Sequence, residues 1–253
     1  MNFLDLYPDL KFFFKNIHIQ GKVLTPQIDQ QLKEIYENEL SKRISAAQLI
    51  SIDMMLKELI QNSIKANIKK WIIQRYKLNP NDKNDYKKAL RILKHILYFV
   101  KIEDFETKID DFDNYFEVFL SFDDKVLIIH VLNEGILLQE EEKRIRRKFR
   151  ESKQDLNIYD YYLQKSDTEE GAGMGILIVI MILKQLGFSE RHFAIFCVKE
   201  GVHFVKTVSR LYIPFKNNYS LPRQRFSEYC ERFSIKPHVL RKKIHSKKIY
   251  LRF

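Results

Sequence analysis

Three alternating glycines that lead into an apolar segment constrain this chain more than any other feature. Gly171, Gly173 and Gly175 precede residues 176–186, which are long enough for a helix that ends at Gly187. Glycine lets the backbone approach a ligand closely, and a helix N-terminus presents unpaired N–H groups and a positive dipole end. The stretch therefore predicts a phosphate-binding turn, and a flexible loop before a core helix is the alternative.

The spacing excludes two familiar phosphate-binding motifs. The dinucleotide fingerprint needs Gly-x-Gly-x-x-Gly after a buried strand, and the P-loop needs a lysine and a hydroxyl residue directly after its last glycine. Here the acidic stretch 167–170 precedes the glycines, and Ile176 follows them. Any phosphate site at this turn must therefore belong to another class.

The composition suits a folded protein with a basic C-terminal extension. The 253 residues are 45% hydrophobic and 13% aromatic, and the net charge is +11. Residues 216–253 carry most of that charge, with 11 Lys/Arg against 2 Asp/Glu.

Cys197 and Cys230 match no disulfide or metal-binding spacing. The N-terminus does not resemble a signal peptide, and the run 176–183 is too short to cross a bilayer, so we expect a cytoplasmic protein without membrane association.

A second informative stretch is the helix predicted over residues 46–77. Glu58 and Asn62 are four residues apart, and Lys65 follows Asn62 by three, so the three side chains point into one space. Asn62 is unusual there, because asparagine competes for backbone hydrogen bonds in a helix. A solvated face with ordinary i,i+4 pairs, which also includes Lys69, is the alternative. The opposite, apolar face carries Ile52, Leu56, Leu59, Ile60 and Ile64.

The remaining elements follow from periodicity and turn residues. Thr25 and Pro26 are typical of a helix start. Asp123 and Asp124 form a turn between two strands, and the second strand leads into Asn133-Glu-Gly135. The predicted helices are 25–42, 85–100 and 140–152, the predicted strands are 115–122, 125–132, 193–199 and 203–214, and 157–170 is predicted to be a loop. In the tail, 225–233 and 237–244 are expected to form short helices.

The order of these features resembles the GHKL ATPase superfamily, which includes gyrase, MutL, histidine kinases and anti-sigma serine kinases. Glu58-Leu-Ile-Gln-Asn62-Ser-Ile-Lys65 is similar to the N box of that family. Gly171-Ala-Gly-Met-Gly175-Ile is similar to its G2 box. The resemblance implies an α+β fold, a two-layer α/β sandwich whose mixed, mostly antiparallel sheet has helices on one face.

The same resemblance implies a division of the chain into three parts. Residues 1–44 would form an N-terminal helical segment, and 45–215 would form the ATP-binding domain. Relative to histidine kinases, a helical insertion is expected at about 79–105. Residues 216–253 would be a basic extension.

The resemblance also assigns roles at the phosphates of ATP. Asn62 matches the Mg²⁺ ligand, and an amide oxygen suits a cation that prefers oxygen ligands. Glu58 matches the general base, and Lys65 matches a phosphate-contacting lysine of histidine kinases. The turn that would close over the phosphates consists of Gly171, Gly173, Met174 and Gly175.

At the base of the nucleotide the chain departs from the family. The G1 box is Asp-x-Gly-x-Gly, whose Asp accepts a hydrogen bond from adenine, whereas this chain has Asn133-Glu-Gly135-Ile-Leu137. Asparagine keeps an acceptor but adds a donor and lacks charge. Thr207 lies seven residues before Pro214, a spacing similar to that of the adenine-side threonine of the family. A plain strand threonine is the alternative.

The primary hypothesis is an ATP- and Mg²⁺-binding signalling protein that resembles a stand-alone histidine kinase catalytic domain or an anti-sigma serine kinase. It would transfer phosphoryl to a partner protein, such as a response regulator or a sigma-factor antagonist, or hydrolyse ATP. The lid between Gly135 and Gly171 would order on nucleotide, with Arg144, Arg146 and Arg147 reaching phosphate or a partner.

Two alternatives stay open. Asn133 and Leu137 favour a degenerate, non-catalytic interaction module of the same fold. The basic tail, with its interleaved aromatic residues, suits nucleic-acid binding. A solvated appendage or a protein-docking helix is the competing interpretation of that tail.

Overall fold

The computed structural model describes residues 15–99, 113–124, 126–135, 137–152, 174–200, 204–215, 230–236 and 239. The chain divides into two units. The larger holds Ile17–Leu120 and Ile128–Tyr212, and the smaller holds Met1–Asn16, Ser121–Leu127 and Ile213–Phe253. The site residues named above that the structure describes all lie in the larger unit.

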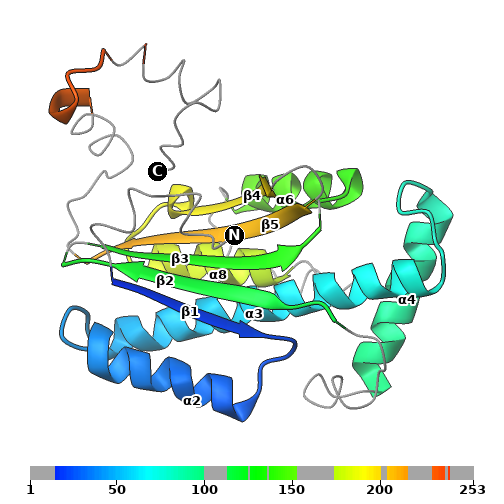
Figure 1. Ribbon diagram of the computed structural model, residues 1–253, viewed down its shortest axis with the longest axis horizontal. Coiled ribbons are helices and arrows are strands. Elements are labelled where there is room, and N and C mark those ends of the chain that lie inside the picture. The colour runs from blue at the N-terminus through cyan, green and yellow to red at the C-terminus, as the bar shows by residue number, and fades with distance from the viewer. Residues whose placement is uncertain are drawn as a thin grey trace. The chain divides into compact units, whose positions relative to one another are not determined.

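The described elements form one sheet with a layer of helices, so the predicted α+β fold is confirmed (Figure 1). The strands lie in the order β1-β2-β3-β5-β4. They are β1 (Lys15–Gly21), β2 (Phe116–Phe122), β3 (Val126–Glu134), β4 (Phe193–Glu200) and β5 (Phe204–Pro214). The helices are α2 (Pro26–Ile35), α3 (Ala46–Arg75), α4 (Lys83–Phe99), α6 (Gln139–Glu151) and α8 (Met174–Gln185). Figure 1 shows α3 and α8 behind the same face of the sheet, and these two helices pack against each other.

Helix α3 forms where the sequence predicts it, because its ends and its apolar face agree. Ser45 caps its N-terminus, and Gln48 completes a reciprocal capping box. The predicted apolar stripe is buried at every position. Helix α2 likewise begins at the predicted cap, where Thr25 accepts a hydrogen bond from the N–H of Ile28 at 3.3 Å.

The four predicted strands correspond to β2, β3, β4 and β5, and β4 pairs antiparallel with β5. The sequence predicts no strand before residue 25, whereas β1 lies at the edge of the sheet beside β2. Its alternating apolar signal consists of Ile17 and Ile19 alone, and only Ile19 is fully buried. So short a pattern does not separate an edge strand from a loop.

The smaller unit contains the hairpin tip at the predicted Asp123–Asp124 turn. The N–H of Val126 donates to the Asp123 carboxylate at 2.9 Å, and the hydroxyl of Ser121 donates to Asn16 Oδ1 at 2.6 Å. In the tail, 230–232 is helical and falls within the predicted helix 225–233. The rest of that helix, most of 237–244 and the whole loop 157–170 lie outside the described residues.

None of the helices in the described ranges combines the length and the apolar character that a membrane span requires.

Candidate functional site

Glu58, Asn62 and Gly175 come together where α3 meets the first turn of α8. The amide Nδ2 of Asn62 donates to Glu58 Oε1 at 3.2 Å, and both side chains are half-buried. Gly175 is buried directly against them. A Cβ added at Gly175 would overlap the Glu58 carboxylate, lying 2.6 Å from its Cδ and 2.8 Å from Asn62 Nδ2. The close approach of the two helices at this point therefore requires glycine.

Helix α8 begins at Met174, two residues earlier than predicted, so Gly175 lies in its first turn. Gly187 follows its end with φ +82°, as expected for a glycine that stops a helix. Leu177, Val179, Ile180 and Leu183 bury the helix in the core. Gly171 and Gly173, and the side chain of Met174, lie outside what the structure describes.

Lys65 and Lys69 extend the same polar face of α3, but their surroundings differ. Lys69 forms an ion pair with Glu141 of α6, and its ammonium lies 5.8 Å from the ring centroid of Tyr86 in α4. Lys65 is half-buried, and it has no hydrogen-bond or ion-pair partner within the part of the chain that the structure describes. Lys65 is thus the cation of this face that is available beside Asn62.

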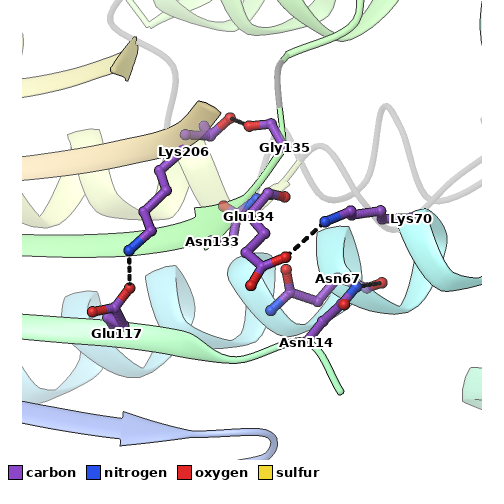
Figure 2. Close-up of polar contacts among 9 residues, drawn as sticks. Asn67, Lys70, Asn114, Glu117, Asn133, Glu134, Gly135 and Lys206 are labelled. Atoms are coloured by element: carbon purple, nitrogen blue, oxygen red, sulfur yellow. Dashed lines mark hydrogen bonds and ion pairs between the residues drawn. The ribbon is translucent and has the colours of Figure 1, made fainter. Parts of the chain in front are cut away.

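Two contacts hold the end of β3 against α3. The buried hydroxyl of Ser63 donates to the carbonyl of Leu132 at 3.1 Å. Oε2 of Glu134, the residue after Asn133, pairs with Lys70 Nζ at 2.7 Å (Figure 2). The turn Asn133–Gly135 is therefore anchored to the helix that carries Glu58 and Asn62.

The turn is also fixed to β5, where Thr207 lies. The Thr207 hydroxyl donates to the carbonyl of Gly135 at 2.8 Å, and the N–H of Gly135 donates to the carbonyl of Val205 at 2.8 Å. Gly135 has φ +106°, which a residue with a side chain rarely adopts. Asn133 Nδ2 donates to the carbonyl of Glu134 at 3.3 Å, so its amide oxygen is the atom left to accept from a ligand.

Leu137, two residues after Gly135, is held by β4. The N–H of Leu137 donates to Cys197 Sγ at 3.4 Å, and Cys197 Sγ lies 3.7 Å from the Thr207 hydroxyl. Leu137 is the residue that the sequence resemblance aligns with the second glycine of the G1 box. Its backbone is thus already committed to a contact within the protein.

Helix α6 forms over the predicted helical run and lies against neighbouring helices. Arg144 donates to the hydroxyl of Tyr86 in α4. Arg146 pairs with Glu142 at 2.6 Å within α6, and Arg147 lies 3.7 Å from Glu151 of the same helix. All three arginines that were expected to reach phosphate or a partner thus have partners inside the protein.

Sequence reasoning did not single out Asn67, which the structure places one turn beyond Ser63. Its side chain is fully buried, and neither amide atom has a hydrogen-bond partner among the described residues. Its backbone carbonyl accepts from Asn114 Nδ2 at 3.3 Å (Figure 2). The only signal in the sequence is an asparagine on the core side of a helix.

The chain matches no protein-family model and no solved structure. A protein of Treponema pallidum (strain Nichols), described as uncharacterized, is 27% identical over 164 residues. The match covers 63% of this chain and 30% of that protein, so the chain spans less than a third of its relative.

Proposed function

We propose that this chain binds Mg-ATP at the junction of α3 and α8 and transfers its terminal phosphoryl group to a partner protein or to water. The observation that carries the proposal is the packing of Gly175 against Glu58 and Asn62. These residues are 113 or more positions apart in the sequence. Their juxtaposition is what the resemblance to GHKL ATPases requires of its N and G2 boxes.

The donor set suits a magnesium nucleotide. Because Asn62 Nδ2 donates to Glu58, the Asn62 oxygen is turned away from that bond and remains an acceptor for a cation. Mg²⁺ is commonly held by few protein oxygens together with phosphate oxygens, whose charge it neutralises. Lys65 would contact phosphate, and the N–H groups at the start of α8 would face the same anion.

Glu58 is the residue that we assign to proton transfer. Its carboxylate lies on the site side of α3, beside the first turn of α8. A carboxylate at this position can orient a water or a hydroxyl and accept its proton as the phosphoryl group moves. Asn62 would thus bind the cation and Glu58 would activate the nucleophile, so that the two roles lie one helical turn apart on α3.

The base of the nucleotide would lie toward Asn133, Gly135 and Thr207. The free amide oxygen of Asn133 can accept one hydrogen bond from an amino group. The Thr207 hydroxyl already donates to Gly135, so Thr207 supports the turn rather than offering its proton to the base.

A second candidate function is a non-catalytic interaction module with the same fold. The observation that favours it is the commitment of the altered turn to internal contacts, since Asn133, Gly135 and Leu137 each bond within the protein. Such a module would work through a protein or nucleic-acid partner, with the basic extension 216–253 as one candidate surface.

Calorimetric titration with a non-hydrolysable ATP analogue, with and without Mg²⁺, separates the two candidates. We expect the wild-type chain to bind the analogue in a Mg²⁺-dependent way. We expect Asn62→Asp to lose this binding, because the variant adds a further negative charge beside Glu58 and the phosphates. Gln74→Glu, which adds the same charge at an exposed position of the same helix, is the control for added charge on α3. Absence of binding by the wild-type chain up to millimolar nucleotide would overturn the proposal in favour of the interaction module.

A further inference from the structure

Helix α4 takes no part in the proposed nucleotide site, and its two faces have opposite character. Tyr86, Ala89 and Leu93 are buried, and α4 packs against α3. This apolar side fixes the helix to the body of the larger unit. The other side of α4 is exposed and strongly basic.

Four cations on the exposed side form a continuous stripe. Lys87, Arg91 and Lys94 follow one another at helical spacing, and Lys88 flanks them. None of the four forms an ion pair or a hydrogen bond with its side chain within the described ranges of the chain. The acid of this helix, Asp85, lies in its first turn and accepts from the N–H of Asn79 at 2.8 Å.

Two exposed aromatic side chains continue the stripe at the C-terminal end of α4. Tyr98 is 82% exposed and Phe99 is 66% exposed. Their ring centroids are 4.9 Å apart in an edge-on arrangement, and the exposed His95 ring lies 4.5 Å from that of Phe99. We call Lys87, Lys88, Arg91, Lys94, Tyr98 and Phe99 together the α4 surface.

Unpaired cations beside exposed rings suit a polyanion that also carries flat apolar groups. An anionic bilayer fits less well, because an amphipathic helix binds it through its apolar face, and that face of α4 is packed on α3. A protein partner fits less well too, because lysine is depleted at protein interfaces and three of the four cations are lysines. A single-stranded nucleic acid supplies both phosphates for the cations and bases for the rings.

We propose that the α4 surface binds single-stranded nucleic acid, with the cationic stripe on the phosphates and Tyr98 stacked on a base. This binding is independent of the nucleotide site and of the tail at 216–253. It has two separable parts. The electrostatic part responds to salt, with a slope of about 0.7 per phosphate for single strands, whereas the stacking part does not.

The test is fluorescence anisotropy with a labelled oligonucleotide of roughly 15 nucleotides and mixed sequence, titrated with the full chain at several salt concentrations. We expect Lys87→Ala/Arg91→Ala to lower the salt slope by about 1.4 and the affinity by roughly tenfold or more at low salt. Tyr98→Ala should lower the affinity by about fivefold or more without changing the slope.

Matched variants separate this surface from general charge and from the tail. Lys42→Ala/Arg191→Ala removes the same charge from exposed sites away from α4, and Tyr76→Ala removes another exposed tyrosine. The tail is present in every variant, so its contribution cancels. Equal losses in the α4 variants and their controls would overturn the proposal. It would also be overturned if phosphatidylserine vesicles or poly-glutamate, but not the oligonucleotide, bound with a dependence on α4.

Discussion

The two ends of the proposed site are built in different ways. At the phosphate end, Glu58 and Asn62 sit one helical turn apart on α3, and Gly175 closes against both. At the base end, Gly135 and Leu137 are held by hydrogen bonds to β5 and β4, and the Asn133 side chain donates to the carbonyl of the adjacent Glu134. The phosphate end has side-chain groups that are available to a ligand, whereas most polar groups at the base end already form hydrogen bonds within the protein.

This difference indicates where binding energy would come from. Charged phosphates and Mg²⁺ gain from the helix N-terminus, a lysine and an amide oxygen, all of which the phosphate end provides. The base end keeps one acceptor on Asn133, and the Glu134 carboxylate beside it is already paired with Lys70. We therefore expect nucleotide affinity to depend on the phosphates and to discriminate little between bases.

The largest expected effect follows from Gly175→Ala. The added methyl group would overlap the Glu58 carboxylate and displace it from Asn62. We expect nucleotide binding to be abolished, with a loss of unfolding free energy of roughly 1–3 kcal/mol for the overpacked site. Calorimetry and chemical denaturation measure the two effects.

Gly187→Ala is the matched control for that variant, because it changes a glycine at the other end of the same helix. Gly187 has φ +82° and nothing within 4 Å of an added Cβ. We expect it to lose about 1 kcal/mol of stability through backbone strain while nucleotide binding is kept. Normal binding by Gly175→Ala would contradict the account of the phosphate end.

Asn133→Asp sharpens the comparison by restoring a carboxylate at the base end. A hydrogen bond to a charged acceptor is stronger than one to an amide by about 1 kcal/mol. We therefore expect ATP to bind about fivefold more tightly and GTP to be unaffected or weakened. Parallel titrations with the two nucleotides measure this change. If both nucleotides respond equally, Asn133 does not face the base.

Thr207→Val removes the hydroxyl that supports the Gly135 carbonyl. The carbonyl would then lack that partner, and we expect a loss of about 1 kcal/mol in unfolding free energy. Mg²⁺-dependent binding of inorganic tripolyphosphate, which needs only the phosphate end, should stay unchanged. Thr207→Ser keeps the hydroxyl and should retain most of the stability.

The smallest effect concerns the polar contacts that hold α2 on α3 beside Glu58. Lys57 lies 2.5 Å from Asp29 and 2.9 Å from Asp53. The hydrogen bonds from Lys57 and Lys33 lower the pKa of Asp29 below its ordinary 3.8. This contribution to stability is therefore full above about pH 4 and is lost as the pH falls through the lowered pKa.

Asp29→Asn should remove that acid-dependent part, which we expect to be about 0.2–1 kcal/mol for partly exposed charges. Denaturation midpoints of the variant and the wild type between pH 2 and pH 7 test it. The two curves should converge at the acid end, and parallel curves would contradict the assignment to Asp29.

Local sequence patterns predicted the helices and most strands, because these elements depend on residues that are neighbours in the sequence. The buried stripe of α3, its polar face and the glycine stop of α8 all follow from 3.6-residue periodicity and cap chemistry. Strand β1 was not predicted, because two alternating isoleucines are too weak a signal. Helical spacing predicted that Glu58 lies beside Asn62, whereas only the resemblance to GHKL ATPases predicted that Gly175 lies near them.

Other features of the site depend on tertiary contacts that no local pattern encodes. The bond from Ser63 to Leu132 and the pair of Lys70 with Glu134 join segments more than 60 residues apart. The ion pair of Lys69 with Glu141 likewise occupies one of the two lysines, Lys65 and Lys69, on the polar face of α3. Which of two neighbouring lysines stays free is decided by where α6 docks, which the spacing of α3 does not specify.

The measurement that tests the central claim most directly is a calorimetric competition between Mg-ATP and inorganic tripolyphosphate with Mg²⁺, with adenosine as the third ligand. If the phosphate end carries the affinity, tripolyphosphate should displace ATP at concentrations within about tenfold of the ATP dissociation constant, and adenosine should not. Displacement by adenosine alone, or the absence of any Mg-ATP binding, would contradict the account.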